Sequence, residues 1–96
     1  MQIIEKVVVI GAGTMGSGIA AAAASAGQTV VLLDIAGPEG ARNAPAERGL
    51  ERIRQSNPPL LLTENDINRI SLGNVEDDLA MIADADWIVE AVVERL

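Results

Sequence analysis

The stretch KVVVIGAGTMG, residues 6–16, decides the fold of this chain. Its first part, from Val7 to Ile10, is apolar at consecutive positions, a pattern that predicts a strand buried on both faces, as in a parallel sheet. Glycines then follow in the spacing G-x-G-x-x-G, and the alanine-rich residues 14–26 have apolar side chains at helical spacing. The stretch therefore predicts a strand, a tight turn and a helix in direct succession.

Working outward, the rest of the chain continues this alternation. We expect strands at 5–10, 29–34, 69–72 and 87–92, and helices at 14–26, 43–55 and 76–83. Alternation of this kind indicates an α/β fold with right-handed crossovers. We predict a Rossmann-type parallel sheet of about four strands, in the order 3-2-1-4, with helices on both faces.

Length and composition exclude several classes of protein. The chain has 96 residues, enough for one small domain, and a net charge of -7, which argues against nucleic-acid binding. It contains no histidine and no cysteine, so disulfides, Cys/His metal sites and histidine-based triads are excluded. The absence of cysteine fits a reducing, cytoplasmic compartment. The uncharged run after Lys6 meets glycine at Gly11, so we expect neither a signal peptide nor a membrane span.

The glycine loop, residues 11–16, predicts a site for a pyrophosphate. Gly11 permits a tight turn, a side chain at Gly13 would occupy the space of the ligand, and Gly16 lets the helix pack closely on the strand. The N–H groups of the first helical turn have no partners within the helix, and the helix dipole favours an anion there. A P-loop is excluded because its G-K-[ST] ending is missing. The alternative is a glycine turn that serves packing alone.

Asp34 closes the second predicted strand, 34 − 16 = 18 residues after Gly16, near the roughly 20 expected of a dinucleotide fingerprint. We expect its carboxylate to accept hydrogen bonds from the adenosine ribose. The same charge would repel a 2′-phosphate, so the sequence predicts NAD rather than NADP. A solvated carboxylate at the end of a strand is the alternative.

Other charged residues are expected to be solvated. Arg48 and Arg52 lie four residues apart, as do Glu47 and Glu51, which is typical of the exposed side of a helix. The aspartates of the second half lack EF-hand spacing, so we predict no metal site.

Five segments of the chain carry a family resemblance: KVVVIGAGTMGSGIA, VVLLDI, GLERI, GNVEDDL and DADWIVEAVVERL. Together they resemble the N-terminal, NAD-binding half of the bacterial-type 3-hydroxyacyl-CoA dehydrogenases. The resemblance runs from Lys6 to Leu96, and its last segment is the most discriminating, because generic dinucleotide folds do not share it.

The resemblance implies an oxidoreductase that converts 3-hydroxyacyl-CoA to 3-oxoacyl-CoA with NAD, in fatty-acid β-oxidation. It implies that residues 11–16 bind the pyrophosphate, that Asp34 and Ile35 hold the adenosine, and that Glu94 contacts the nicotinamide-side ribose. The expected cofactor-binding residues are Gly11, Ala12, Gly13, Thr14, Met15, Gly16, Asp34, Ile35, Ala91, Val92 and Glu94. The expected partners are an acyl-CoA and further copies of the parent protein, with no nucleic acid and no membrane.

The chain also departs from the family pattern. The family's catalytic base is a histidine, so no catalytic residue is assigned here, and we expect the 96 residues alone to be inactive. We interpret residues 1–96 as the N-terminal part of the NAD-binding domain, without its C-terminal part or the helical substrate and dimer domain. The strand at 87–92 would then be an exposed edge, which predicts self-association. Alternatives are another NAD-dependent 3-hydroxyacid dehydrogenase, an FAD-dependent oxidoreductase and a stand-alone nucleotide-sensing module.

Overall fold

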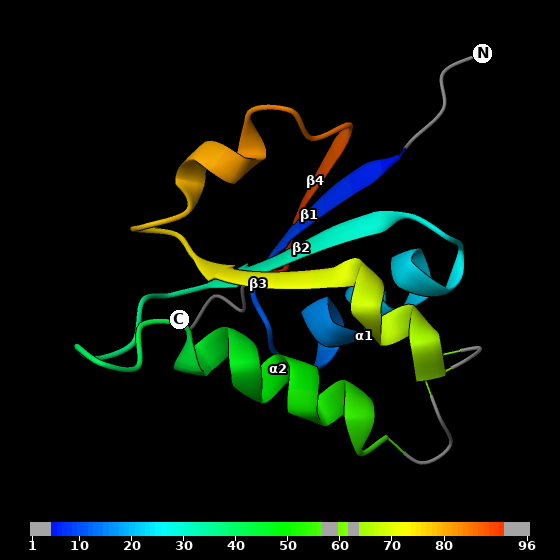
Figure 1. Ribbon diagram of the computed structural model, residues 1–96, viewed down its shortest axis with the longest axis horizontal. Helices are drawn as coiled ribbons and strands as arrows, with labels where there is room; N and C mark the ends of the chain where they lie inside the picture. Colours follow the sequence, from blue (N-terminus) through cyan, green and yellow to red (C-terminus); the bar gives the residue numbers. More distant parts are fainter. Residues whose placement is uncertain (1–4, 57–59, 62–63, 92–96) are drawn as a thin grey trace.

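The structure, a computed structural model, describes residues 5–56, 60–61 and 64–91. Four strands alternate with two α-helices and two short 3-10 helices, η1 and η2 (Figure 1). In chain order these are β1 (Lys6–Ile10), α1 (Thr14–Ser25), β2 (Thr29–Asp34), α2 (Ala44–Arg54), η1 (Glu64–Arg69), β3 (Ile70–Asn74), η2 (Leu79–Ile82) and β4 (Trp87–Glu90).

The strands form one parallel sheet in the order β3-β2-β1-β4, which confirms the predicted topology. Val8 of β1 pairs with Val31 of β2 on one side and with Ile88 of β4 on the other. The apolar side chains of β1 and β2 at the centre are almost completely buried on both faces. This is why their sequences are apolar at consecutive rather than alternate positions.

Helices cover both faces of the sheet, but unequally. Both α-helices pack on one face, and η2, drawn in orange, lies on the other (Figure 1). The steps from β1 to β2 and from β2 to β3 cross the sheet in one direction, so right-handed connections place α1 and α2 on the same face. The return from β3 to β4 places η2 on the opposite face, against Val8, Val31 and Leu33.

Small residues on α1 allow a close approach to the sheet. Ala20, Ala21 and Ala24 are completely buried and belong to the same core cluster as Val7 and Val9. This contact fixes the start of α1, and with it the glycine loop, above the carboxyl end of β1.

The predicted helix at 76–83 is the main difference from expectation, because only Leu79–Ile82 is helical, as a 3-10 turn. The side chain of buried Asn74 accepts hydrogen bonds from the N–H groups of Glu76 and Asp77, at 3.0 and 2.8 Å. Such a side-chain turn competes with a helix start. The strand predicted at 87–92 is described as Trp87–Glu90, and Val92 lies outside the described residues. The other elements begin and end within two residues of their predicted bounds.

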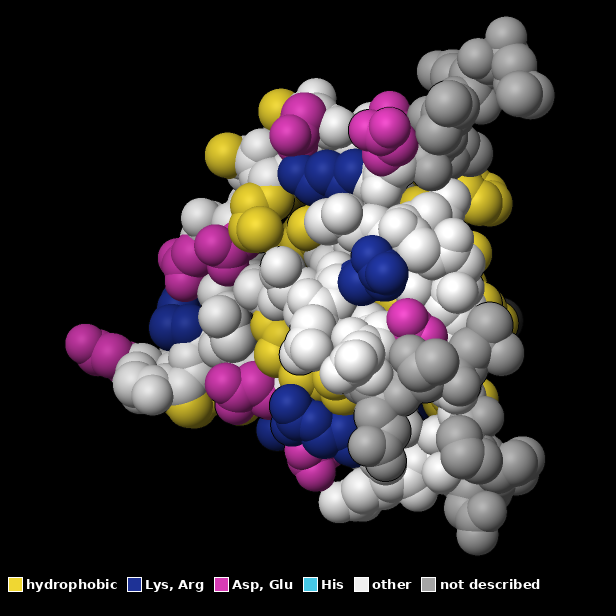
Figure 2. All heavy atoms as spheres, turned by 45° about the vertical axis from the view of Figure 1, so that its right-hand side comes forward, with side chains coloured by type: hydrophobic (Ala, Val, Ile, Leu, Met, Phe, Trp, Pro, Cys, Tyr) yellow, Lys and Arg dark blue, Asp and Glu magenta, His cyan; other side chains and the backbone are white. Residues whose placement is uncertain are grey.

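Charges of both signs lie near one another on the surface. Figure 2 shows Lys and Arg side chains interspersed with Asp and Glu side chains on the face that it presents. Lys6 pairs with Asp84, and Arg42 pairs with Asp77 at 3.0 Å between Nε and Oδ2. Among the described helices, none is long and apolar enough to cross a membrane.

Candidate functional site

The candidate site lies at the carboxyl ends of the four parallel strands. A hollow of about 270 Å³ opens there, lined by Ile10, Gly11, Ala12, Gly13, Asp34, Ile35, Val75 and Ala91. β1 has β2 on one side and β4 on the other. The loop after β1 crosses toward β2, whereas the loop after β4 lies on the other side of β1, so a crevice opens between these two loops. Ligands of open α/β sheets bind in the crevice at such a point.

A second hollow of about 180 Å³ continues from the first toward α2. The two share Ala12, Gly13, Asp34 and Ile35, and the second adds Pro45, Arg48 and Arg52. We call this continuous space the loop groove. It brings together six of the predicted site residues, namely Gly11, Ala12, Gly13, Asp34, Ile35 and Ala91.

The three glycines of the loop differ in their surroundings. Gly11 has a φ of +109°, which side chains rarely adopt, and its N–H donates to the carbonyl of Leu33 at 2.7 Å. A Cβ on Gly16 would lie 1.6 Å from the carbonyl oxygen of Gly11, so the helix cannot carry a side chain there. A Cβ on Gly13 would meet no heavy atom within 4 Å, because this residue faces open space.

The first turn of α1 leaves its backbone donors available. Gly13 is the N-cap residue, and the first turn has neither an acidic side chain nor a side-chain cap. Thr14 and Met15 are exposed at this end and line neither hollow, whereas Gly16 is buried. Unpaired N–H groups and the positive end of the helix dipole make such a terminus suited to an anion.

Asp34 lines both parts of the loop groove. Its Oδ2 accepts the N–H of Ala12 at 2.7 Å, and its Oδ1 accepts the N–H of Ile35 at 2.6 Å. The carboxylate thus ties the end of β2 to the glycine loop, a structural task that its position in the sequence does not reveal. Each carboxylate oxygen has a further lone pair that can accept a ligand hydroxyl.

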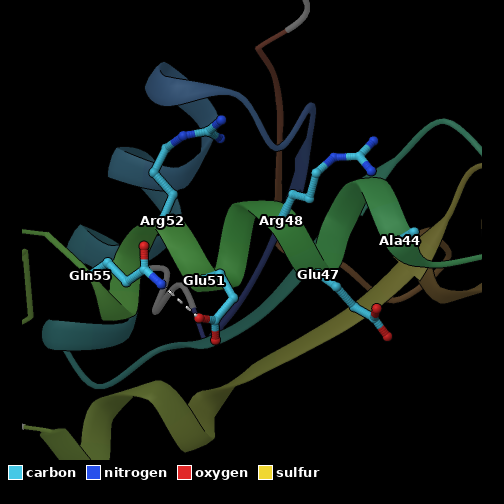
Figure 3. A pocket seen from close by; sticks show the side chains of 6 residues that line it. All are labelled: Ala44, Glu47, Arg48, Glu51, Arg52 and Gln55. Atoms are coloured by element: carbon cyan, nitrogen blue, oxygen red, sulfur yellow. Dashed lines mark hydrogen bonds between the residues drawn. The ribbon is translucent and has the colours of Figure 1, made fainter.

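Arg52 is exposed, as predicted for a solvated helix face, but its guanidinium also contacts the glycine loop. Its Nη1 donates to the carbonyl oxygen of Ala12 at 2.7 Å, and the buried Ser17 hydroxyl donates to the same oxygen at 3.0 Å. Figure 3 shows Arg48 and Arg52 extending from α2 toward the glycine loop, while Glu47 and Glu51 point away from it. The spacing of the arginines indicates a shared side of the helix but not what lies opposite.

Gly49 is a second residue whose importance the sequence analysis missed. A Cβ there would lie 2.6 Å from the Cβ of Ala12 and 2.8 Å from the Ala12 carbonyl oxygen. The signal was present, because a glycine inside a predicted helix is unfavourable by about 1 kcal/mol relative to alanine and often marks a close approach. Without the fold, the approaching partner could not be named.

Two predicted site residues, Val92 and Glu94, lie outside the described residues. Within residues 5–56, 60–61 and 64–91, no group of three or more carboxylates could hold a metal ion.

Comparison with known proteins decides which family the chain belongs to. Residues 6–96 match the profile of the family described as "3-hydroxyacyl-CoA dehydrogenase, NAD binding domain". The chain belongs to this family. The match confirms the resemblance, the Rossmann-type fold and NAD, rather than FAD, as the cofactor of the family.

Several individual proteins are similar to this chain. A Deinococcus radiodurans protein named "Probable 3-hydroxyacyl-CoA dehydrogenase" is 45% identical over 94 residues, which cover 97% of this chain and 27% of that protein. A Rickettsia felis protein, named as a fatty acid oxidation complex trifunctional enzyme, is 43% identical over 94 residues, covering 97% of this chain and 13% of its own. The crystal structure of (S)-3-hydroxybutyryl-CoA dehydrogenase PaaH1 from Ralstonia eutropha superimposes with a TM-score of 0.74 at 33% identity, covering 98% of this chain and 33% of that one. The chain thus spans about a quarter of the length of the Deinococcus relative.

Proposed function

We propose that the loop groove of this chain binds NAD for a dehydrogenase that oxidises 3-hydroxyacyl-CoA to 3-oxoacyl-CoA. The observation that carries the proposal is the convergence of two groups on one groove: the uncapped start of α1 at Gly13 and the carboxylate of Asp34. A dinucleotide needs both, because it presents an anionic pyrophosphate and a hydroxyl-bearing ribose a few ångströms apart.

Each part of the groove has a role in this proposal. The N–H groups at the first turn of α1, from Gly13 to Met15, donate to the pyrophosphate. Asp34 accepts the adenosine ribose hydroxyls in charge-assisted bonds, each worth about 1.5–3 kcal/mol. Ile35, which is 68% exposed, offers an apolar surface to the adenine.

The nicotinamide half of the cofactor is expected to extend toward the end of β4. Ala91 lines the loop groove there. The family resemblance assigns Val92 and Glu94 to the same half, with Glu94 at the ribose. Bound NAD supplies the hydride acceptor of the reaction.

The proposed reaction also needs a general base, because the 3-hydroxyl must lose a proton as hydride leaves its carbon. The 96 residues contain no histidine, the base of the family. We propose that these residues bind the cofactor without turning over substrate by themselves, as the N-terminal part of the NAD-binding domain of a longer protein.

We also propose a substrate, a cellular location and an oligomeric state for the longer protein. An acyl-CoA substrate and a role in β-oxidation are supported by the names of the relatives from Deinococcus and Rickettsia. A cytoplasmic location agrees with the lack of cysteine. A homo-oligomeric parent protein is supported by the family resemblance alone.

Replacement of Asp34 tests the proposal. We expect Asp34→Ala to weaken NAD binding to the 96-residue chain at least about tenfold, since it removes a charge-assisted bond of about 1.5–3 kcal/mol. The preference for NAD over NADP should fall as well, because the repulsion of the 2′-phosphate is lost. Isothermal titration of both cofactors measures this, with Glu39→Ala, a change of an exposed loop carboxylate, as the control.

Two results would contradict the proposal. One is an unchanged NAD affinity in the Asp34→Ala chain. The other is a wild-type chain that binds FAD in preference to NAD.

A further inference from the structure

We infer that Arg52 is a positioning residue, which holds the peptide between Ala12 and Gly13 in the orientation that presents the Gly13 N–H to an anionic ligand. The inference rests on the proposed NAD site and adds to it a residue from a different element. It begins from the hydrogen bonds that meet at Ala12.

The main chain of Ala12 is held on both of its sides. Its N–H donates to Asp34 at 2.7 Å, and its carbonyl oxygen accepts from the Ser17 hydroxyl at 3.0 Å and from the Arg52 guanidinium at 2.7 Å. Ala12 itself is 3% exposed and Ser17 is completely buried. The exposed Arg52 guanidinium adds a charge-assisted bond to this oxygen, beside the neutral bond from the Ser17 hydroxyl.

This arrangement determines where the next N–H points. In a planar trans peptide the carbonyl and the N–H point in opposite directions. Holding the Ala12 carbonyl against Arg52 and Ser17 therefore turns the Gly13 N–H away from them. A Cβ on Gly13 would meet no heavy atom within 4 Å, which agrees with a backbone that faces open space at the start of α1.

The contact with Arg52 also compensates the partial negative charge of the Ala12 carbonyl oxygen, which is unfavourable beside an anion. A carbonyl oxygen turned into the loop groove would repel a phosphate, whereas an oxygen covered by a guanidinium does not. Arg52 lines the groove together with Gly13, so its positive charge also adds to the helix dipole there.

The packing of α2 supports a dedicated contact rather than a chance one. Gly49 lies one turn before Ile53, a core residue, and a Cβ at position 49 would lie 2.8 Å from the Ala12 carbonyl oxygen. Only a glycine allows α2 close enough for Arg52 to reach this oxygen from the next turn. The acidic side chains of α2, Glu47 and Glu51, point away from the loop (Figure 3).

A comparison of two ligands tests the inference. ADP carries a pyrophosphate and adenosine does not, so a residue that positions the Gly13 N–H affects ADP alone. We expect Arg52→Met to weaken ADP binding to the 96-residue chain about tenfold, with adenosine binding unchanged. Titration calorimetry measures both affinities, and the NMR signal of the Gly13 amide in the ligand-free chain reports whether the surroundings of this peptide change.

Arg54→Met is the matched control. It removes the same charge from the same helix and breaks only an exposed pair with Glu51 (2.7 Å), a contact of little energy. It should leave the affinity ratio of ADP to adenosine and the Gly13 amide signal unchanged. If Arg52→Met does not fold, Arg52→Lys takes its place, since it keeps the stem and the charge but loses the guanidinium fork. We expect Arg52→Lys to lower the same ratio by a smaller factor.

The outcomes separate the two proposals. A wild-type chain that binds neither NAD nor ADP would refute the proposed function and the inference with it. A wild-type chain that binds ADP, with an equal ADP-to-adenosine ratio in the Arg52 and Arg54 variants, would refute the inference alone. An equal loss of ADP and adenosine affinity in a folded Arg52 variant would also refute the inference, because a positioning role affects ADP alone.

Discussion

Ala12 connects three elements through its main chain rather than its side chain. Its hydrogen bonds reach Asp34 at the end of β2, Ser17 in α1 and Arg52 in α2. Two positions near it must be glycine: a Cβ on Gly49 would lie 2.8 Å from the Ala12 carbonyl oxygen, and a Cβ on Gly16 would lie 1.6 Å from the Gly11 carbonyl oxygen. The geometry of the glycine loop therefore depends on the small size of its neighbouring glycines and on the orientation of the Ala12 peptide groups.

Gly16 and Gly18 give a test of the steric requirement within one helix. A Cβ on Gly16 would lie 1.6 Å from the Gly11 carbonyl oxygen, whereas a Cβ on Gly18 would meet nothing within 4 Å. We expect Gly16→Ala to lower the free energy of unfolding by about 3 kcal/mol or more, because the loop must shift. We expect Gly18→Ala to leave it unchanged or raise it by up to about 1 kcal/mol.

Urea unfolding followed by circular dichroism compares these two variants. Both substitutions make the same change of intrinsic helix propensity, so the difference between them isolates the steric clash. Equal stability of the two variants would mean that α1 does not approach β1 as described.

Among the elements, the strand ends are joined by side chains that bind backbone groups. Asn74 organises the turn after β3 and shortens the predicted helix to η2. Asp86, just before β4, accepts the N–H groups of Glu5 and Lys6 at the start of β1, both at 2.9 Å. The Asp86 bonds tie the start of β4 to the start of β1, whereas the Asn74 bonds order the turn after β3.

Asp86 makes the stability of the chain dependent on pH. The backbone hydrogen bonds from Lys6 and Glu5 hold the pKa of Asp86 below its usual 3.8. Hydrogen bonds from Lys6 and Arg42 likewise lower the pKa values of Asp84 and Asp77. Carboxylates with a lowered pKa in the folded state stabilise it fully above their usual pKa, and this stabilisation is lost as the pH falls through the folded-state pKa.

We therefore expect the melting temperature to fall on acidification below about pH 4. Because Asp86→Asn cannot ionise, this variant should start from a lower melting temperature at neutral pH and lose less of it on acidification. Differential scanning calorimetry across this range measures both curves, with Glu39→Gln as the control. Parallel curves for wild type and Asp86→Asn would contradict the assigned role.

In the molecule as a whole, the sheet is closed on neither side by another strand of the described residues. β4 pairs with β1 along one side only, and its Trp87 and Ile88 are 56% and 46% exposed. An exposed apolar edge strand is a template for pairing with another chain, and lysine is the usual protection against it.

We expect the 96-residue chain to self-associate as its concentration rises, as measured by light scattering. Ile88→Lys should reduce this association by placing a charge on the edge. Leu79→Lys is the control, because Leu79 is similarly exposed, at 54%, but lies in η2 rather than on the edge. A wild-type chain that stays monomeric at high concentration would refute the prediction.

The sequence by itself determined the sheet and the place of the site. Consecutive apolar residues in β1 and β2 favour burial on both faces of a parallel sheet, and right-handed crossovers restrict the strand order to a few possibilities. Among these, the glycine motif after β1 favours the order 3-2-1-4. The glycine motif after β1 and the carboxylate of Asp34 at the end of β2 can also be recognised from the sequence, since each lies within a short segment. Their meeting follows from the parallel order of the strands.

Only the tertiary structure decided which other groups serve that site. The spacing of Arg48 and Arg52 places them on one side of α2 but cannot say that this side faces Ala12, because the packing angle of α2 depends on Gly49 and on the core beneath it. In the same way, the bond from the Ala12 N–H to Asp34 joins residues 22 positions apart. Contacts between distant elements arise from how complete surfaces fit together, and no local pattern of residues encodes them.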